Sequence, residues 1–137
     1  MSKKMEYSER RFKEPVVLAE GEYEGFKYIV LNLGTHPCAY VNVGHTWLRG
    51  MNYWDVEKLE NCIVHGDFTY SNERVRGTDV AGWWLGWDYS HYGDQYGKGD
   101  FGLYGRKYTT AEIEFECRNA IDQLKKIAET ARKEFVQ

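Results

Sequence analysis

Apolar residues recur every three or four positions through the last fifth of the chain, which is the spacing of one helix face. Thr109 and Glu112 precede this run at the separation of a capping box, in which each residue bonds the backbone of the other. The pattern predicts a helix of about 27 residues beginning near Thr109, roughly 40 Å long at 1.5 Å per residue. Its apolar stripe consists of Ile113, Cys117, Ala120, Ile121, Leu124, Ile127, Ala128, Ala131 and Phe135. We expect this helix to lie along a sheet and bury its stripe there.

Shorter stretches before residue 90 alternate between apolar and polar positions, as strands do. The stretches predicted as strands are residues 15–20, 23–33, 38–43, 62–70 and 81–89. Gly34 to Pro37 has the composition of a turn, so the second and third strands should form a hairpin. Glu20-Gly21-Glu22 should end the first strand, and residues 55–59 should form a turn or two of helix. The pattern predicts an α+β fold, in which a mainly antiparallel sheet of four to five strands packs against one long C-terminal helix.

Length and composition fit a single domain. The chain has 137 residues, of which 42% are hydrophobic and 16% aromatic, which is enough to build one core. We expect one α+β domain over residues 15–137, preceded by a flexible N-terminal arm over residues 1–14. The net charge of −3 gives no strong nucleic-acid signal.

Cysteine usage and the N-terminal residues fit a cytoplasmic protein. Cys38, Cys62 and Cys117 are far apart and odd in number, so neither a disulfide framework nor a zinc knuckle is indicated. The first residues are charged and polar, so we expect no signal peptide and no membrane span. The sequence leaves the oligomeric state open, a homo-oligomer included.

The stretch from Gly82 to Asp94 combines an aromatic strand with ionisable groups. One face of the predicted strand is continuously apolar, and the other carries Gly82, Trp84, Gly86 and Asp88. Glycines on one face of a strand leave space for a ligand or another backbone. We therefore expect a groove beside Trp84, with the carboxylate of Asp88 at its end, on the sheet face that the helix leaves uncovered.

Imidazoles and carboxylates near this groove suggest a divalent metal ion as a cofactor. Asp88, His91 and Asp94 are three residues apart, and His65 and Asp67 should project from one face of a predicted strand. Histidine and aspartate together suit zinc, manganese or iron, although the spacing matches no named metal signature. The candidate ligands are His65, Asp88, His91 and Asp94, with His45 as a further ligand from a loop.

A metal-free site for a small polar molecule is an alternative use of the same region. Aromatic side chains can stack on a planar base and guanidinium groups can bind a phosphate; the aromatic candidates are Trp84, Tyr89, Tyr92 and Tyr96. The candidate ligand-binding residues are His45, His65, Trp84, Asp88, His91, Asp94, Arg74 and Arg76. A structural role for them is a further alternative, because Asp and His near turns often bond to backbone and tryptophans pack in cores. The Gly/Tyr-rich residues 90–107 are either a flap over the groove or a connector.

Three blocks of the chain carry distinctive motifs. They are Cys38-Ala-Tyr-Val41 running to His45, Val64-His-Gly-Asp-Phe-Thr-Tyr-Ser71, and Trp83-Trp-Leu-Gly-Trp-Asp-Tyr-Ser-His-Tyr-Gly-Asp94. Together they resemble a family of small proteins encoded by tailed bacteriophages and prophages, over about residues 38–125. This chain differs from the family pattern at Asp67 and Ser90, and it matches an acid and a Q-L pair of the family's C-terminal helix at Glu116 and Gln123-Leu124. The resemblance implies a phage accessory protein that works in the bacterial cytoplasm.

Three functions fit these features. The first is a phage accessory protein that binds a small polar, nucleotide-like ligand in the groove and counters host defence. The second is a metal-assisted hydrolase that uses the same His/Asp cluster with a metal-bound water as nucleophile. The third is an interaction protein that blocks a host bacterial protein through its Tyr/Trp surface. The sequence does not determine whether the chain is an enzyme.

Overall fold

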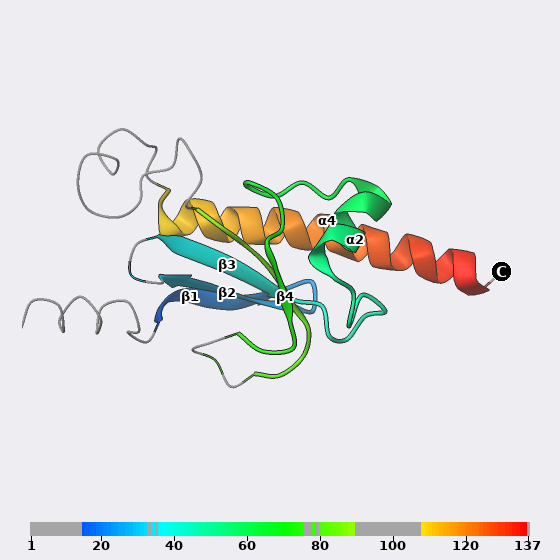
Figure 1. Ribbon diagram of the computed structural model, residues 1–137, viewed down its shortest axis with the longest axis horizontal. Helices are drawn as coiled ribbons and strands as arrows, with labels where there is room; N and C mark the ends of the chain where they lie inside the picture. Colours follow the sequence, from blue (N-terminus) through cyan, green and yellow to red (C-terminus); the bar gives the residue numbers. More distant parts are fainter. Residues whose placement is uncertain are drawn as a thin grey trace, which may run out of the picture.

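The computed structural model describes residues 15–32, 34, 36–75, 78, 80–89 and 108–136. Its elements are β1 (Val16–Tyr23), β2 (Phe26–Asn32), β3 (Pro37–Asn42), α2 (Tyr53–Glu60), β4 (Tyr70–Asn72), β5 (Trp84–Asp88) and α4 (Thr110–Val136). The strands form one sheet in the order β1-β2-β3-β5-β4, in which every neighbouring pair is antiparallel. Figure 1 shows α4 running along this sheet and continuing past α2. The α+β prediction, with an antiparallel sheet and one long C-terminal helix, is confirmed.

The first two strands form a hairpin that the sequence pattern missed. Glu24 and Gly25 both have a positive φ, of 52° and 83°, as the two-residue turn of a tight hairpin requires. The predicted break at residues 20–22 is wrong, because all three pair with β2. Gly21 is tolerated in the strand since the ring of Tyr28 occupies the space where a side chain would stand. The predicted hairpin after it is confirmed as β2 and β3.

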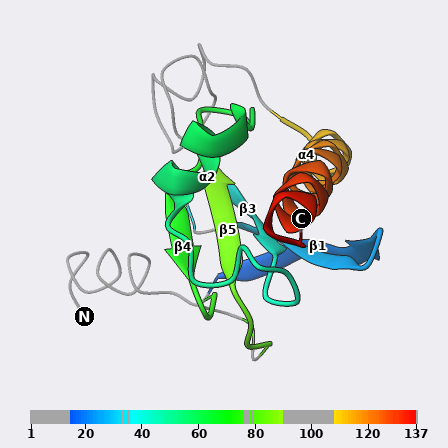
Figure 2. The same ribbon diagram turned by 90° about the vertical axis from the view of Figure 1, so that its right-hand side faces the viewer.

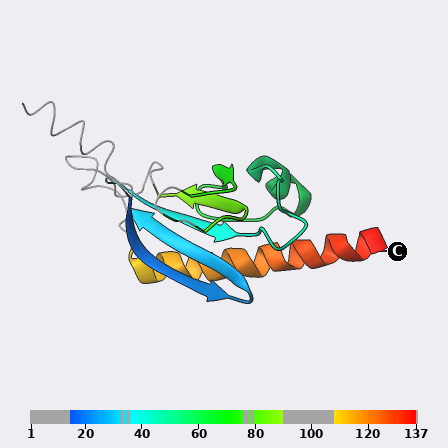
Figure 3. The same ribbon diagram turned by 90° about the horizontal axis from the view of Figure 1, so that it is seen from below.

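α4 lies along one face of the sheet (Figure 3), and its apolar stripe packs against that face. The capping box forms as predicted: the Thr109 amide donates to Glu112 and the Glu112 amide donates to the Thr109 hydroxyl, each at 3.1 Å. The buried residues of α4 are Ile113, Cys117, Ala120, Ile121, Leu124 and Ile127. They share a core with the strand residues Tyr28, Val30, Ala39, Val41, Leu85 and Trp87. The side chains of Ala131 and Phe135 lie outside the described part of the chain. No helix among the described residues is long and apolar enough to cross a membrane.

Polar contacts along one edge of α4 fasten it to the β1–β2 hairpin. The Tyr28 hydroxyl donates to the Glu114 carboxylate at 2.8 Å. The Lys125 ammonium lies 3.0 Å from the Glu24 carboxylate at the hairpin turn. The second pair is exposed and adds little stability, but together the two contacts fix how the helix is rotated about its axis.

Residues 62–69 do not form the strand that their alternation predicts. Gly66 and Asp67 have positive φ values of 63° and 67°, whereas strands need a strongly negative φ. Only Tyr70–Asn72 pairs with β5, as the short edge strand β4. The inference that His65 and Asp67 project from one strand face is therefore wrong.

Helix side chains bond to the backbone of this irregular segment in place of a neighbouring strand. The Gln123 amide makes two hydrogen bonds to Ile63, accepting from its N–H and donating to its C=O, both at 2.7 Å. The N–H of His65 donates to the Glu116 carboxylate. The N–H of Phe68 donates to the carboxylate of Glu57 on α2 at 2.7 Å. Backbone groups outside a sheet ladder need other partners, and here side chains from α4 and α2 provide them.

The face of the sheet away from α4, which we call the open face, has a smaller core of its own. Its buried residues are Ile29, Leu31, Cys38, Tyr40, Val75 and Trp84. Val75 comes from the chain between β4 and β5, so this connection covers part of the open face. Figure 2 shows β4, β5 and this connection away from α4. The Tyr40 ring lies where a Gly86 side chain would stand, so the gap predicted at Gly86 is filled.

We predict that Glu57→Ala lowers the free energy of unfolding by about 1–3 kcal/mol, the usual cost of a buried donor left without an acceptor. The donor is the N–H of Phe68, a residue that is only 2% exposed. Glu57→Gln should recover most of the loss, because its amide oxygen can still accept this bond. Glu129→Ala, an exposed change on α4, is the control and should stay within about 0.5 kcal/mol of wild type. Urea unfolding measures all three, and equal stabilities for Glu57→Ala and wild type would contradict the assigned role.

Candidate ligand-binding groove

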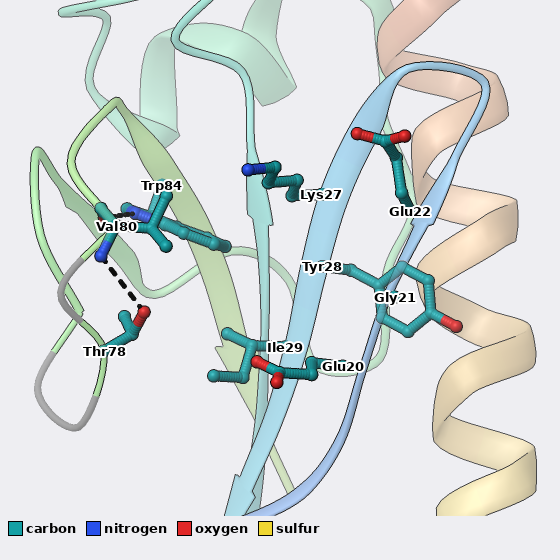
Figure 4. A pocket seen from close by; sticks show the side chains of 9 residues that line it. All are labelled: Glu20, Gly21, Glu22, Lys27, Tyr28, Ile29, Thr78, Val80 and Trp84. Atoms are coloured by element: carbon teal, nitrogen blue, oxygen red, sulfur yellow. Dashed lines mark hydrogen bonds between the residues drawn. The ribbon is translucent and has the colours of Figure 1, made fainter.

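Two adjoining hollows lie on the open face, between β1 and the chain that leads into β5. The first has a volume of about 400 Å³ and is lined by Glu20, Gly21, Glu22, Lys27, Tyr28, Ile29, Thr78, Val80 and Trp84. Figure 4 shows Val80 and Trp84 on one side of it and Glu22 on the other, with Lys27 and Ile29 between them. The second has a volume of about 320 Å³ and shares Glu22, Lys27 and Val80 with the first. We call the two together the open-face groove.

Hydrogen bonds hold the Val80 side of the groove in place. The Val80 N–H donates to the Thr78 hydroxyl at 3.2 Å, and the Val80 carbonyl accepts from the Trp84 indole N–H at 3.0 Å. Val80 is 39% exposed and Trp84 only 2%. This side therefore presents an apolar surface made mainly by Val80, with the indole packed behind it.

Basic side chains gather in the second hollow. Its remaining lining residues are Gly25, Asn42, Gly44, His45, Arg49, Ala81 and Gly82. Lys27, His45 and Arg49 are all exposed, so their charged or polar ends are available to a ligand. The guanidinium of Arg49 donates to the Gly44 carbonyl at 3.4 Å, and the imidazole of His45 packs edge-on against Phe26 at 4.5 Å. The first contact holds the guanidinium beside the backbone of Gly44, and the second places the imidazole of His45 beside Phe26, a residue of the helix-facing core.

Acidic side chains occupy the β1 side. Glu20 and Glu22 project from the open face of this strand, because each is paired there with an open-face residue of β2, Ile29 and Lys27 respectively. The groove thus has an acidic side along β1 and a basic end at Lys27, His45 and Arg49. A ligand with both an anionic group and hydrogen-bond donors matches this distribution of charge.

Asn42 lines the basic end and is the buried polar residue of the described core, at 9% exposure. Its side-chain oxygen accepts two backbone N–H groups, from Gly44 at 2.8 Å and from Trp83 at 3.2 Å. A side chain on Gly82 would collide with the Asn42 amide, so glycine is required for this close approach. The amide bridges the end of β3 to the start of β5 and shapes the hollow.

The predicted candidates are distributed over different parts of the molecule. Trp84 and His45 both line the open-face groove. Asp88 follows Trp84 and Gly86 on the same strand face, and its carboxylate accepts from the Thr69 hydroxyl at 3.4 Å, but it lines neither hollow. Arg74 is exposed after β4, where its carbonyl accepts from the hydroxyl of Tyr70, and it also lies outside the two hollows.

His65 lies on the helix-facing side of the sheet. Its ring stacks on Tyr89 at 4.4 Å with a 13° interplanar angle, and it meets Tyr108 edge-on at 4.8 Å. Tyr89 is 1% exposed and accepts from the Trp87 indole at 3.1 Å. The strand alternation therefore separates His65 from Asp88, which faces the opposite side.

The structure tests the predicted stacking rings directly, but only part of the predicted metal site. Among the described residues, no group of three or more His, Cys, Asp or Glu side chains is arranged to hold a metal ion. His91, Asp94, Arg76, Tyr92 and Tyr96 lie outside the described residues, so the metal-assisted hydrolase remains a prediction. Of the two alternatives for the rings of Trp84 and Tyr89, stacking on a ligand and packing in a core, the burial of both rings favours packing in a core.

Sequence patterns missed most of the side chains that line the groove. Lys27 and Arg49 gave no signal, because isolated basic residues on strands and loops are usually solvated. The composition around Glu20 and Glu22 predicts a strand end, where the structure has a continuous strand. The one available signal was the strand alternation in residues 26–31, which places Lys27 on the same face as Ile29 and Leu31.

We predict that the thiols of the native protein resist modification at pH 8. Burial raises the pKa of Cys38 and Cys62 to about 12, so neither supplies a thiolate nucleophile. Because thiols in the unfolded chain ionise near pH 9, the unfolded state loses protons first, and stability should fall as the pH rises from about 9 toward 12. Reaction with a thiol reagent, with and without denaturant, and unfolding at pH 8 and 10.5 measure both effects. Rapid labelling of the folded chain would refute the buried placement.

The side chains of the open-face groove are the basis for assigning a function. No protein-family model, curated protein or solved structure matches this chain.

Proposed function

We propose that the protein binds a small anionic, nucleotide-like molecule in the open-face groove. The observation that carries the proposal is the gathering of Lys27, His45 and Arg49 around one hollow. These residues come from β2 and from the chain after β3. Lysine and arginine are the side chains that proteins use most often to bind phosphate and carboxylate groups.

The size of the groove supports a ligand of this class. Small-molecule sites usually measure about 300–1,000 Å³, and the two hollows have volumes of about 400 and 320 Å³. An anionic group bound near Arg49 leaves the rest of the ligand to extend toward Val80. Val80 and the edge of Trp84 provide apolar contact there, while Glu20 and Glu22 can accept hydrogen bonds from amino groups.

The resemblance to phage-encoded proteins supports an infected bacterial cell as the place where this binding occurs. We propose that the ligand is a nucleotide of the infected bacterial cell and that sequestering it counters a host defence signal. Binding alone would suffice for this role, so no reaction is required of the groove.

We predict that Lys27→Ala and Arg49→Ala each weaken nucleotide binding by roughly two- to tenfold, the value of an exposed charge-assisted contact. Calorimetry with nucleoside monophosphates and the corresponding nucleosides measures this, and only the monophosphates should lose affinity on these substitutions. Added salt should weaken monophosphate binding, because the contacts are exposed.

Lys126→Ala is the matched control, because it removes an exposed lysine of α4, which packs on the opposite face of the sheet. This variant should bind as wild type does. Absence of heat with every mono-, di- and cyclic nucleotide would overturn the proposal. Equal weakening by Lys126→Ala would show that the net charge, and not the groove, attracts the ligand.

A further inference from the structure

We infer that Asn42 is the specificity-determining residue of the open-face groove, donating a hydrogen bond from its side-chain amide to the anionic group of the ligand. The inference rests on the proposed function, since it concerns the same groove. The inference adds an uncharged residue, Asn42, to the proposed ligand-binding residues. It also restricts the bound group to a hydrogen-bond acceptor, such as a phosphate oxygen.

The orientation of the Asn42 amide is set by its neighbours. Backbone N–H groups can only donate, and two of them, from Gly44 and Trp83, point at the side-chain oxygen. The oxygen must therefore face the backbone, and the NH2 group must point the other way. If the Asn42 amide were flipped, its NH2 group would face the N–H groups of Gly44 and Trp83, and neither bond could form.

The NH2 group has no acceptor among the residues that the structure describes. Asn42 is nevertheless 91% buried, from its exposed fraction of 9%, and a buried donor without a partner is costly. Because Asn42 lines the second hollow, a ligand bound there can supply the missing acceptor.

The neighbouring side chains indicate what that acceptor is. Lys27 and Arg49 offer only donors, and they line the same hollow as Asn42, together with the single carboxylate of Glu22. A group that accepts from an amide, an ammonium and a guanidinium together is an oxyanion. An amine or an uncharged donor would leave the Asn42 NH2 group without an acceptor, so the hollow selects against such groups.

The structural role of Asn42 can be separated from its proposed binding role. The backbone of Gly44 and Trp83 needs only an acceptor at residue 42, and a carboxylate provides one. Asn42→Asp therefore keeps both backbone bonds but replaces the NH2 donor with an oxygen that repels an anion. Asn32→Asp is the matched control: it makes the same change at a residue whose oxygen accepts from the Gly34 N–H at 2.7 Å and which lines neither hollow.

The test uses inorganic phosphate as the probe, titrated into the full-length chain at constant ionic strength and followed by NMR at the amides of Gly44 and Gly82. We expect Asn42→Asp to weaken phosphate binding by about tenfold or more, as loss of a charge-assisted bond implies. Asn32→Asp should bind as wild type does. Unchanged affinity in Asn42→Asp would overturn the inference while leaving the proposed function in place.

The side-chain NH2 resonances of Asn42 in the wild-type protein give a second readout, which decides the matter even if Asn42→Asp does not fold. These resonances should shift together with the Gly44 and Gly82 amides as phosphate is added. Shifts at the glycines without any at the Asn42 side chain would refute the inference alone. No shift at any of the three would refute the proposed function and the inference with it.

Discussion

The apolar stripe of α4 has to be buried, and one face of the sheet is the surface that buries it. Ile121 and Leu124 are fully buried there against strand residues such as Val41 and Leu85. Burial of this kind is the main driving force of folding, but it does not fix how a helix is rotated. Polar contacts at the two edges of the stripe, to the β1–β2 hairpin and to residues 62–69, supply that directional constraint. The helix thereby determines which face of the sheet remains for a ligand.

The irregular segment at residues 62–69 depends on this arrangement. Its one backbone bond to a strand among the described residues is from the Thr69 N–H to the Gly86 carbonyl at 2.9 Å. Elsewhere the side chains of Glu57, Glu116 and Gln123 bond to its backbone instead. This bonding holds the chain in a bend and turns His65 toward the helix-facing aromatic rings. A regular strand would have placed alternate side chains on the open face. The position of His65 thus depends in part on Glu116 and Gln123, which bond to backbone groups more than fifty residues away in sequence.

The open face combines an apolar core with charged side chains because its two halves are covered differently. Over β3 and β5, the connection that carries Val75 packs on Tyr40 and Trp84, and Gly86 leaves room for the ring of Tyr40. Over β1 and β2, the charged side chains Glu20, Glu22 and Lys27 remain exposed. The groove forms at the boundary between these halves. At its basic end, the Asn42 side chain accepts hydrogen bonds from the backbone N–H groups of Gly44 and Trp83. An apolar side beside fixed donors is the usual character of a small-molecule site.

The sequence by itself determined the fold class, the C-terminal helix with its capping box, the β2–β3 hairpin and the aromatic strand. These features depend on local periodicity and on contacts between residues three or four positions apart, so a pattern can reveal them. The sequence also pointed to Trp84 and His45, which line the groove, and left open whether the Trp84 ring stacks on a ligand or packs in the core. Only the tertiary structure decided that residues 62–69 bend, that Tyr40 fills the space at Gly86, and that Lys27, Asn42 and Arg49 share one hollow. The physical reason is that these outcomes depend on strand register and on bonds between side chains and distant backbone, which no local pattern encodes.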